Sequence, residues 1–391
     1  MKMRKIAAML MAAVMCLGLL AGCGNGDAPA NSPSAGDGDA AVIKIGGIGP
    51  LTGSVAQYGV ATKQGAEIAI EEINALGGIR FELNSQDDEG DGEKGVNAYN
   101  NLMDWGMHIL YGCTTSGSCA AVAAESYADR VFQLTPSASS TTVTDGHDNV
   151  FQLCFTDPNQ GKTAANFIAE NNLAAKIAVI YNNGDDYSTG IYQGFAAEAE
   201  KLGLEIVSVT TFPEDTTTDF SVQLTDAYTN GAELVFLPIY YTPASNILIQ
   251  AKQLGYEFGY FGCDGLDGIL TLEGFDTSLA EGVYVLTPFD TASDSAKSFI
   301  QKYEAAYGES PNQFAADGYD CMYALLAACE KAGITSDMTY DQVCEALIAV
   351  FTDSGFAVDG LTGSGMSWAA NGEVAKDPLI VQIVDGAYVN Q

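Results

Sequence analysis

The chain has 391 residues, of which 47% are apolar and 17% are charged, and its formal net charge is −34. This composition indicates a folded chain that is longer than a single core usually organises, so two lobes are expected. A field this negative repels nucleic acid and anionic membrane surfaces, and neither is expected to be a primary partner. The electrostatic cost of binding is smaller for a neutral or zwitterionic ligand than for an anionic one.

The first 22 residues are expected to be a lipoprotein signal peptide. Basic residues precede an apolar run that ends at Leu20, and this run is too short for a permanent membrane span. The small residues before Cys23 resemble the lipobox of bacterial lipoproteins, so we expect Cys23 to carry a lipid. Residues 23–41 lack apolar periodicity and are expected to form a flexible linker. The sequence thus predicts a protein that is anchored by lipid at the extracellular face of the bacterial cell membrane.

Removal of the signal peptide leaves 13 basic and 50 acidic residues, a net charge of −37, together with seven cysteines besides Cys23. A structural zinc site needs close cysteine pairs and histidines, whereas no CxxC occurs and the chain has only two histidines. We therefore expect no metal, no cofactor and no full disulfide framework, with thiols that are buried and free. These cysteines are Cys113, Cys119, Cys154, Cys263, Cys321, Cys329 and Cys344.

From residue 42 onward, short apolar runs alternate with segments of helical spacing. The first run, "VIKIGGI", predicts a strand, and the apolar spacing of residues 66–76 predicts a helix that ends at Gly77 and Gly78. Further strands are predicted at 81–85, 108–111, 131–134, 176–181, 204–211, 233–238 and 257–262. Helices are predicted between them at 95–105, 118–128, 161–171, 189–202, 220–230 and 244–254. This alternation favours parallel sheets with helices on both faces.

The number of such units is compatible with a barrel as well as with two open sheets. Against a barrel, three helices follow in succession, at 296–307, 316–332 and 340–351, before a strand-like tail, "LIVQIVDGAYV". We therefore predict an α/β fold with two doubly wound parallel sheets linked by chain crossings. In open α/β sheets, ligands bind beyond the carboxyl ends of the strands.

Two predicted strands end in turns that are rich in hydroxyl groups. In "YGCTTSGSCAAV", Ser116 or Ser118 stands near the start of a helix, where unpaired amides and the helix dipole favour an anion such as a carboxylate. In "LTPSASS", Ser137 and Ser139 follow the next strand. The alternative interpretation is that Ser118 only caps its helix.

An acidic residue follows a strand in the second half of the chain. In "GYFGCDGLDG", Asp264 could pair with an ammonium group. The hydroxyl-rich turns would then bind a carboxylate opposite it, and a free α-amino acid carries both of these groups. A few charge-assisted hydrogen bonds, at about 1.5 to 3 kcal/mol each, could sustain micromolar binding. The alternative is an Asp-Gly pair that only forms a turn.

The motif order resembles that of the Leu/Ile/Val-binding proteins of bacterial amino-acid ABC transporters. The resemblance rests on "IGGIGPLTGSVAQYGVATKQGAEIAIEEINALGGI", "YGCTTSGSCAAV", "LTPSASS", "FGCDG" and "FAADGYDCMYAL", and it covers residues 42–391. It implies a type I periplasmic binding protein fold, in which two lobes close over a ligand around a three-crossover hinge. The implied lobes are 42–156 with 288–351, and 157–287 with 352–391.

Site residues follow from the resemblance position by position. Ser116 and Ser139 would offer hydroxyls, and Ser137 a backbone group, to the ligand carboxylate, while Asp264 would bind the ammonium group. An aromatic and apolar wall would come from Tyr58, Tyr187, Tyr240 and Phe314, for which plain core packing is the alternative. Two features depart from the family: "DDEGDGEKG" lacks the cysteine that forms a disulfide in some relatives, and Cys263 stands where a small residue or proline is common.

The resemblance implies that the protein is no enzyme and has no catalytic residue, but is a monomeric binding protein that passes an amino acid to a membrane permease. Branched-chain amino acids are the first expectation. The alternative is a ligand-sensing module for an aromatic or polar amino acid, or for a urea- or amide-type ligand, acting with a separate membrane receptor. The "DDEGDGE" segment begins like an EF-hand loop but has Ala98 at the twelfth position, so we interpret it as a solvated acidic loop.

Overall fold

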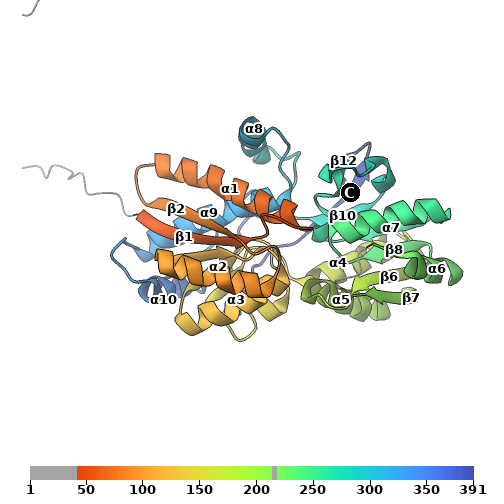
Figure 1. The fold of residues 1–391 in the computed structure, drawn as a ribbon, viewed down its shortest axis with the longest axis horizontal. Coiled ribbons are helices and arrows are strands. Elements are labelled where there is room, and N and C mark those ends of the chain that lie inside the picture. The colour runs from red at the N-terminus through yellow and green to blue at the C-terminus, as the bar shows by residue number, and fades with distance from the viewer. Residues whose placement is uncertain (1–41, 214–217) are drawn as a thin grey trace, which may run out of the picture. The chain divides into compact units, whose positions relative to one another are not determined.

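The computed structural model describes residues 42–213 and 218–391. The predicted signal peptide, Cys23 and the linker to residue 41 lie outside the described residues. Two sheets form the framework, and in Figure 1 the strands and helices of the first sheet lie to the left of those of the second. The prediction of two doubly wound sheets is confirmed.

The first sheet has five parallel strands in the order β2-β1-β3-β4-β5. Apolar side chains on both faces explain why β1, β3, β4 and β5 are buried in a layered fold, whereas β2 at one edge is mostly half-buried or exposed. The strands are β1 (Val42–Gly49), β2 (Arg80–Asp87), β3 (Ile109–Gly112), β4 (Phe132–Thr135) and β5 (Val150–Gln152).

Helices cover both faces of this sheet. One face packs against α1, α9 and α10 in a core that includes Ile45, Phe151 and Leu325, and the other packs against α2 and α3 through residues such as Leu102 and Val122. The helices are α1 (Ala56–Ala75), α2 (Gly92–Trp105), α3 (Ser116–Asp129), α9 (Gln313–Ala332) and α10 (Tyr340–Phe351), with the 3-10 turn η1 (Thr141–Val143) after β4.

The second sheet has the order β12-β11-β10-β9-β8-β6-β7. From β6 to β10 all pairs are parallel, and β11 and β12 add an antiparallel edge. The order β7-β6-β8-β9-β10 repeats the topology of the first sheet. The strands are β6 (Lys176–Asn182), β7 (Glu205–Phe212), β8 (Leu234–Leu237), β9 (Gly259–Gly262), β10 (Tyr284–Thr287), β11 (Leu379–Val384) and β12 (Ala387–Asn390).

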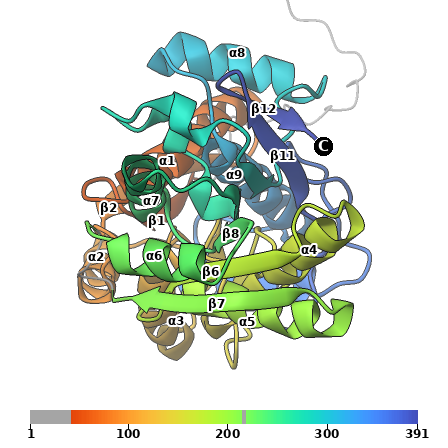
Figure 2. The same cartoon turned by 90° about the vertical axis from the view of Figure 1, so that its right-hand side faces the viewer.

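The second sheet is also covered on both faces, as Figure 2 shows with α4 and α5 on one side and α6 and α7 on the other. Capping residues explain where α5 begins and ends. At its start the Asp185 carboxylate accepts a hydrogen bond from the Ser188 amide, and at its end Gly203 adopts a left-handed conformation with φ +72°. The helices are α4 (Asp157–Glu170), α5 (Asp186–Leu202), α6 (Ser221–Thr229), α7 (Tyr241–Leu254) and α8 (Ala296–Tyr307), with 3-10 turns η2 (Asp264–Leu266), η3 (Ile269–Thr271) and η4 (Thr277–Ala280).

Most predicted elements match these bounds to within a few residues, but α1 begins at Ala56, well before the helix predicted from residue 66, and two strands were not predicted. These are β5 and β10, which have only three and four residues and are too short for a pattern to distinguish them from loops. The interpretation of 87–93 as a solvated loop is wrong for Asp88, which is buried and accepts a hydrogen bond from the Ser118 hydroxyl (2.7 Å). Among the described residues, no helix combines the length and apolarity that crossing a membrane requires.

The lobe limits stay a prediction, and one of them needs revision. Residues 352–391 were assigned to the second lobe, yet Phe356, Met366 and Trp368 pack in the core of the first sheet. The Trp368 indole N–H also donates to the carbonyl oxygen of Gln152 (2.7 Å). We therefore propose that the third crossing lies after Val374, which belongs to the same core, and before β11.

Trp368→Ala should lower the free energy of unfolding by about 3 to 5 kcal/mol, because it removes a buried ring that packs against Phe351 in a tilted arrangement (centroids 4.6 Å apart) and leaves a cavity. Urea denaturation followed by circular dichroism measures this. The exposed Val222 (76% exposed) provides the control substitution Val222→Ala. A loss below about 1 kcal/mol for Trp368→Ala would contradict the proposed boundary.

Candidate ligand-binding site

The two sheets present their carboxyl-terminal strand ends to one small cavity. The segments after β1, β3 and β4 approach it from the first sheet, and those after β6, β8 and β9 approach it from the second. Its volume is about 10 Å³, which is about the space that one water centre needs. It is lined by Tyr58, Thr114, Thr115, Ser116, Ser137, Tyr187, Tyr240, Asp264, Gly265 and Phe314.

Seven of the eight predicted ligand-binding residues therefore lie around one cavity. The eighth, Ser139, is fully buried nearby, and its backbone carbonyl accepts from the Asp157 amide (3.0 Å). The Ser139 hydroxyl has no hydrogen-bond partner. The structure thus brings together residues from positions 58 to 314 that the sequence separates, although their role in binding stays a prediction.

The first sheet contributes hydroxyl groups and a helix start. Helix α3 begins at Ser116, and the first amides of a helix have no partner within it. The Ser116 hydroxyl oxygen accepts from the Ser140 amide (3.2 Å), so its proton remains available to a ligand. The Ser137 hydroxyl donates to the Thr114 carbonyl (2.7 Å), and its backbone amide donates to the Thr135 hydroxyl (3.3 Å).

The alternative interpretation of Ser118 as a helix cap is wrong. The N-cap residue of α3 is Thr115, and Ser118 lies within the first turn, where its hydroxyl bonds to Asp88. The Thr115 hydroxyl oxygen is buried without a hydrogen-bond partner. The first backbone amides of α3 therefore donate to no side-chain cap.

The second sheet contributes a buried carboxylate. Asp264 is only 4% exposed, and its Oδ1 accepts from the Tyr187 hydroxyl (2.7 Å). The same hydroxyl accepts from the Gly265 amide (2.8 Å), and a Cβ at Gly265 would lie 2.6 Å from it, so that contact needs glycine. Burial raises the pKa of Asp264 to about 6, although the hydrogen bond from the Tyr187 hydroxyl and the nearby Gln160 side chain lower it.

A second acid beside Asp264 was missed by the sequence analysis. Asp157 begins α4, is fully buried, and neither of its carboxyl oxygens has a hydrogen-bond partner. Burial, with the nearby Asp264 carboxylate, raises its pKa well above the ordinary value, although the Ser139 hydroxyl beside it lowers it. Gln160, one turn later, accepts from the Asp264 amide (3.1 Å) and has an unpartnered side-chain nitrogen.

The signal that could have found Asp157 is its place after β5. It follows a strand of the first sheet and starts a helix, as Ser116 does, but the short β5 was not predicted and Asp157 was interpreted only as a lobe limit. No Lys, Arg or His lines the cavity among the described residues. Two buried acids without a cationic partner favour a ligand that brings its own positive charge.

Aromatic rings close the cavity from both lobes. Tyr58 of α1 contacts Phe314 (centroids 4.4 Å) and Tyr240 (5.6 Å), and Tyr187 stacks on Tyr240 (4.9 Å). The Tyr58 hydroxyl donates to the Gly265 carbonyl and accepts from the Tyr241 amide (3.2 Å). These contacts join elements of the first sheet directly to elements of the second.

The comparisons with known proteins identify the family. A family model described as a periplasmic binding protein matches residues 42–387. The chain belongs to this periplasmic binding protein family. It is 32% identical to a Leu/Ile/Val-binding protein homologue of Brucella melitensis over 302 residues, which cover 75% of this chain and 80% of the relative. The predicted resemblance is confirmed.

Solved structures of periplasmic binding proteins agree with this assignment and with the predicted type I fold. A leucine-binding protein of Thermotoga maritima matches with a TM-score of 0.79 at 28% identity, covering 89% of this chain and 97% of the other. A branched-chain amino acid transporter substrate-binding protein of Streptococcus pneumoniae, solved with isoleucine, matches with a TM-score of 0.79 at 29% identity and the same coverage. Members of this family bind solutes outside the cytoplasm.

Asp264→Asn should flatten part of the pH dependence of stability. Because the folded state holds the Asp264 proton up to about pH 6, whereas the unfolded chain releases it near the ordinary value of 3.8, the free energy of unfolding decreases as pH rises from about 4 to 6. The contribution of this group is at most about 3 kcal/mol. Urea denaturation at pH 4, 5, 6 and 7 measures it.

The control is Asp145→Asn, which makes the same chemical change at an exposed position of the first lobe. Its pH profile should be parallel to that of the unaltered chain. If Asp264→Asn is also parallel, the inferred burial cost of the Asp264 carboxylate is wrong.

Proposed function

We propose that this protein captures a free α-amino acid, with Leu, Ile or Val as first candidates, and delivers it to an ABC transporter permease. The observation that carries the proposal is the buried Asp264 carboxylate, which faces the start of α3 across one cavity without a cation of its own. The names of the similar proteins from Brucella melitensis and Streptococcus pneumoniae support the ligand class.

The ligand ammonium group would bind Asp264, with Asp157 as a second acid beside it. Their raised pKa values reflect a folded state that a buried positive charge would stabilise. The ligand carboxylate would accept hydrogen bonds from the Ser116 hydroxyl and the first amides of α3. Ser139 and the backbone of Ser137 would contact it from the other side. Charge-assisted hydrogen bonds of this kind contribute about 1.5 to 3 kcal/mol each.

The ligand side chain would lie among Tyr58, Tyr240 and Phe314. These rings are buried or partly buried, and such a wall favours an aliphatic side chain over a charged one. The cavity of about 10 Å³ is much smaller than a leucine. The amino acid would therefore enter while the lobes are apart, and the lobes would close on it.

The position of the protein in the cell is also a proposal. The lipobox-like residues before Cys23 support a lipid anchor at the outer face of the membrane, with residues 23–41 as a tether. The partner would be the membrane permease of the transporter, which the closed form would contact. The monomer state and the permease both stay predictions.

Asp264→Asn should weaken leucine binding by about 10- to 100-fold, because it removes one charge-assisted hydrogen bond to the ammonium group. Isothermal titration calorimetry at pH 7.5 measures the dissociation constant, and Asp145→Asn should leave it unchanged. Two leucine analogues sharpen the test: 4-methylpentanoate lacks the ammonium group, and isoamylamine lacks the carboxylate. If either binds as tightly as leucine, the zwitterion site is wrong.

Tyr58→Phe should weaken leucine binding by about 2- to 12-fold, because it removes the hydroxyl that bonds to Gly265 and Tyr241 across the two lobes. Small-angle X-ray scattering should show compaction on adding leucine to the unaltered chain. The exposed Tyr228 provides the control Tyr228→Phe. Equal affinities for Tyr58→Phe and the control would contradict a role for Tyr58 in closure.

A further inference from the structure

Two loops of the first lobe form the side of the candidate site that would bind the ligand carboxylate. The β3 loop, residues 113–116, follows β3, and the β4 loop, residues 136–140, follows β4. A side chain ties the loops together, because the Ser137 hydroxyl of the β4 loop donates to the Thr114 carbonyl of the β3 loop (2.7 Å). A displacement of either loop therefore displaces the other.

One peptide group of the β4 loop sets the direction of the Ser116 hydroxyl. The Ser140 N–H donates to the Ser116 hydroxyl oxygen (3.2 Å), so the hydrogen of that hydroxyl must point elsewhere, and Ser116 lines the candidate cavity. The carbonyl of the same peptide group, that of Ser139, accepts from the Asp157 amide (3.0 Å). Whether the Ser116 proton is available to a ligand thus depends on the orientation of this peptide group.

Gln152, the last residue of β5, holds the peptide groups on both sides of that one. Its side-chain nitrogen donates to the carbonyl oxygens of Ala138 (2.7 Å) and Ser140 (3.0 Å), which flank the peptide group between Ser139 and Ser140. Both partners are acceptors, so the amide nitrogen must face them, and both of its hydrogens are used. The orientation of the β4 loop is therefore fixed by one side chain.

Gln152 is itself firmly held. It is fully buried, its backbone amide donates to the Gly372 carbonyl (2.9 Å), and its carbonyl accepts from the Trp368 indole N–H (2.7 Å). Its side-chain oxygen has no hydrogen-bond partner among the described residues, so the two bonds to the β4 loop are the polar contacts that this side chain makes. An apolar residue of the same size would bury no unpaired oxygen. The amide at this position is explained by the loop that it holds.

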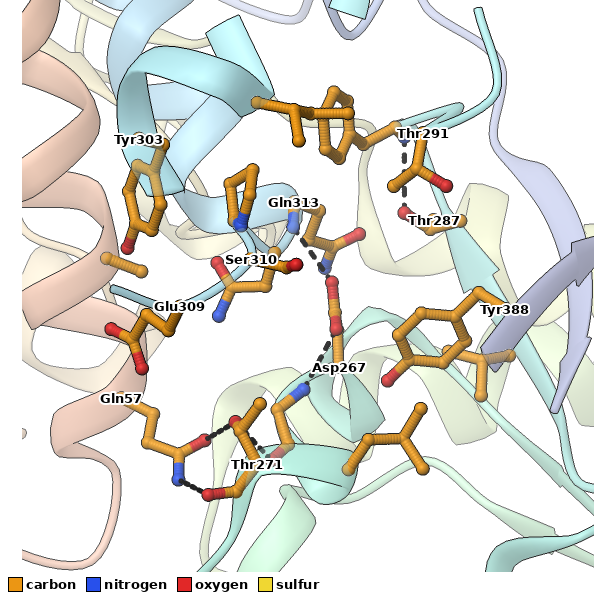
Figure 3. A pocket seen from close by; sticks show the side chains of 18 of the residues that line it. Gln57, Asp267, Thr271, Thr287, Thr291, Tyr303, Glu309, Ser310, Gln313 and Tyr388 are labelled. Carbon is orange, nitrogen blue, oxygen red and sulfur yellow. Dashed lines mark hydrogen bonds between the residues drawn. The ribbon is translucent and has the colours of Figure 1, made fainter. Parts of the chain in front are cut away.

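A second buried amide holds the backbone on the ammonium side of the site. Gln313 begins α9 and is 1% exposed, and its side-chain nitrogen donates to the Asp264 carbonyl (3.1 Å). Its backbone amide donates to the Asp267 carboxylate (2.9 Å), as a dashed line in Figure 3 marks. Gln313 also lines a larger cavity of about 570 Å³, whose interior Figure 3 shows and which shares no lining residue with the candidate site.

We propose that Gln152 is a positioning residue for amino-acid binding, which orients the Ser116 hydroxyl toward the ligand carboxylate by holding the β4 loop. Gln152 is not among the residues that line the cavity, so it acts through this loop and not by contact with the ligand. The role rests on the proposed function, because it requires that the ligand carboxylate binds at Ser116.

Gln152→Met keeps the length and approximate volume of the side chain and removes both donors. It should raise the leucine dissociation constant about tenfold, the effect of one lost hydrogen bond to the ligand carboxylate. Isothermal titration calorimetry at pH 7.5 measures this, and circular dichroism establishes that the variant is folded. A change of less than about twofold would overturn the proposal.

Asn149→Leu is the matched control for a general loss of stability. Asn149 is also fully buried, its side-chain nitrogen also donates to two backbone carbonyls, those of Ser126 (3.1 Å) and Val131 (2.6 Å), and its side-chain oxygen also has no partner among the described residues. These partners lie at the opposite end of α3 from Ser116. Leucine affinity should stay within about twofold. If both variants weaken leucine binding equally, destabilisation explains the effect and the proposal is overturned.

A double-mutant cycle tests whether Gln152 acts through Ser116. Ser116→Ala should weaken leucine binding about tenfold, and adding Gln152→Met should weaken it less than about twofold further, because both changes remove the same hydrogen bond. Multiplied effects, about 100-fold in the double variant, would overturn the proposal. An unchanged affinity in Ser116→Ala would overturn it as well.

Hydrogen exchange in the absence of amino acid separates this role from the proposed function. By NMR, Gln152→Met should speed exchange of the Ser140 amide at least tenfold, whereas Asn149→Leu should not. If the exchange rates respond in this way but the unaltered chain binds no amino acid, the proposed function fails while the hold on the β4 loop stands. If leucine binds and neither its affinity nor the exchange rate changes in Gln152→Met, only the role of Gln152 fails.

Discussion

The burial of the Asp264 carboxylate is the constraint around which the rest of the site is arranged. The Tyr187 hydroxyl, the Gln160 side chain and the close packing at Gly265 hold it in place, yet none of these groups carries a positive charge. Burial of a charge without a counter-charge is costly, and its pKa rises as a result. An ammonium group supplied by a ligand would remove that cost, so the binding energy and the instability of the unliganded site have the same origin.

Repetition of one topology places this carboxylate opposite a set of hydrogen-bond donors. Both sheets have the strand order 2-1-3-4-5 when each is counted from its own first strand, so each has a switch point beside its first strand, where ligands of open α/β sheets bind. In each sheet the segments after the first, third and fourth strands reach the same cavity. A zwitterion, with opposite charges at its two ends, fits between two such edges better than a ligand of one charge.

The two cavities differ in what they can hold, and Gln313 stands between them. The smaller one is lined by hydroxyl groups and one acid, Asp264, whereas the larger one has mostly apolar walls and no basic lining residue among those described. Gln313 bonds to the Asp264 carbonyl through its side chain and to the Asp267 carboxylate through its backbone. Movement of α9 relative to η2 would therefore alter both cavities together.

The sequence by itself determined the alternation of strands and helices, the hydroxyl-rich turns and the position of Asp264 after a strand, because these features depend on local periodicity and on residue type. The order of its motifs also indicated the family. The tertiary structure alone decided the pairing of short strands such as β5, the burial of Asp157 beside Asp264 and the packing of Trp368 against the first sheet. Each depends on neighbours that are distant in the chain, and a local pattern contains no information about such neighbours. The larger cavity belongs to the same class, since its walls come from segments between residues 56 and 388.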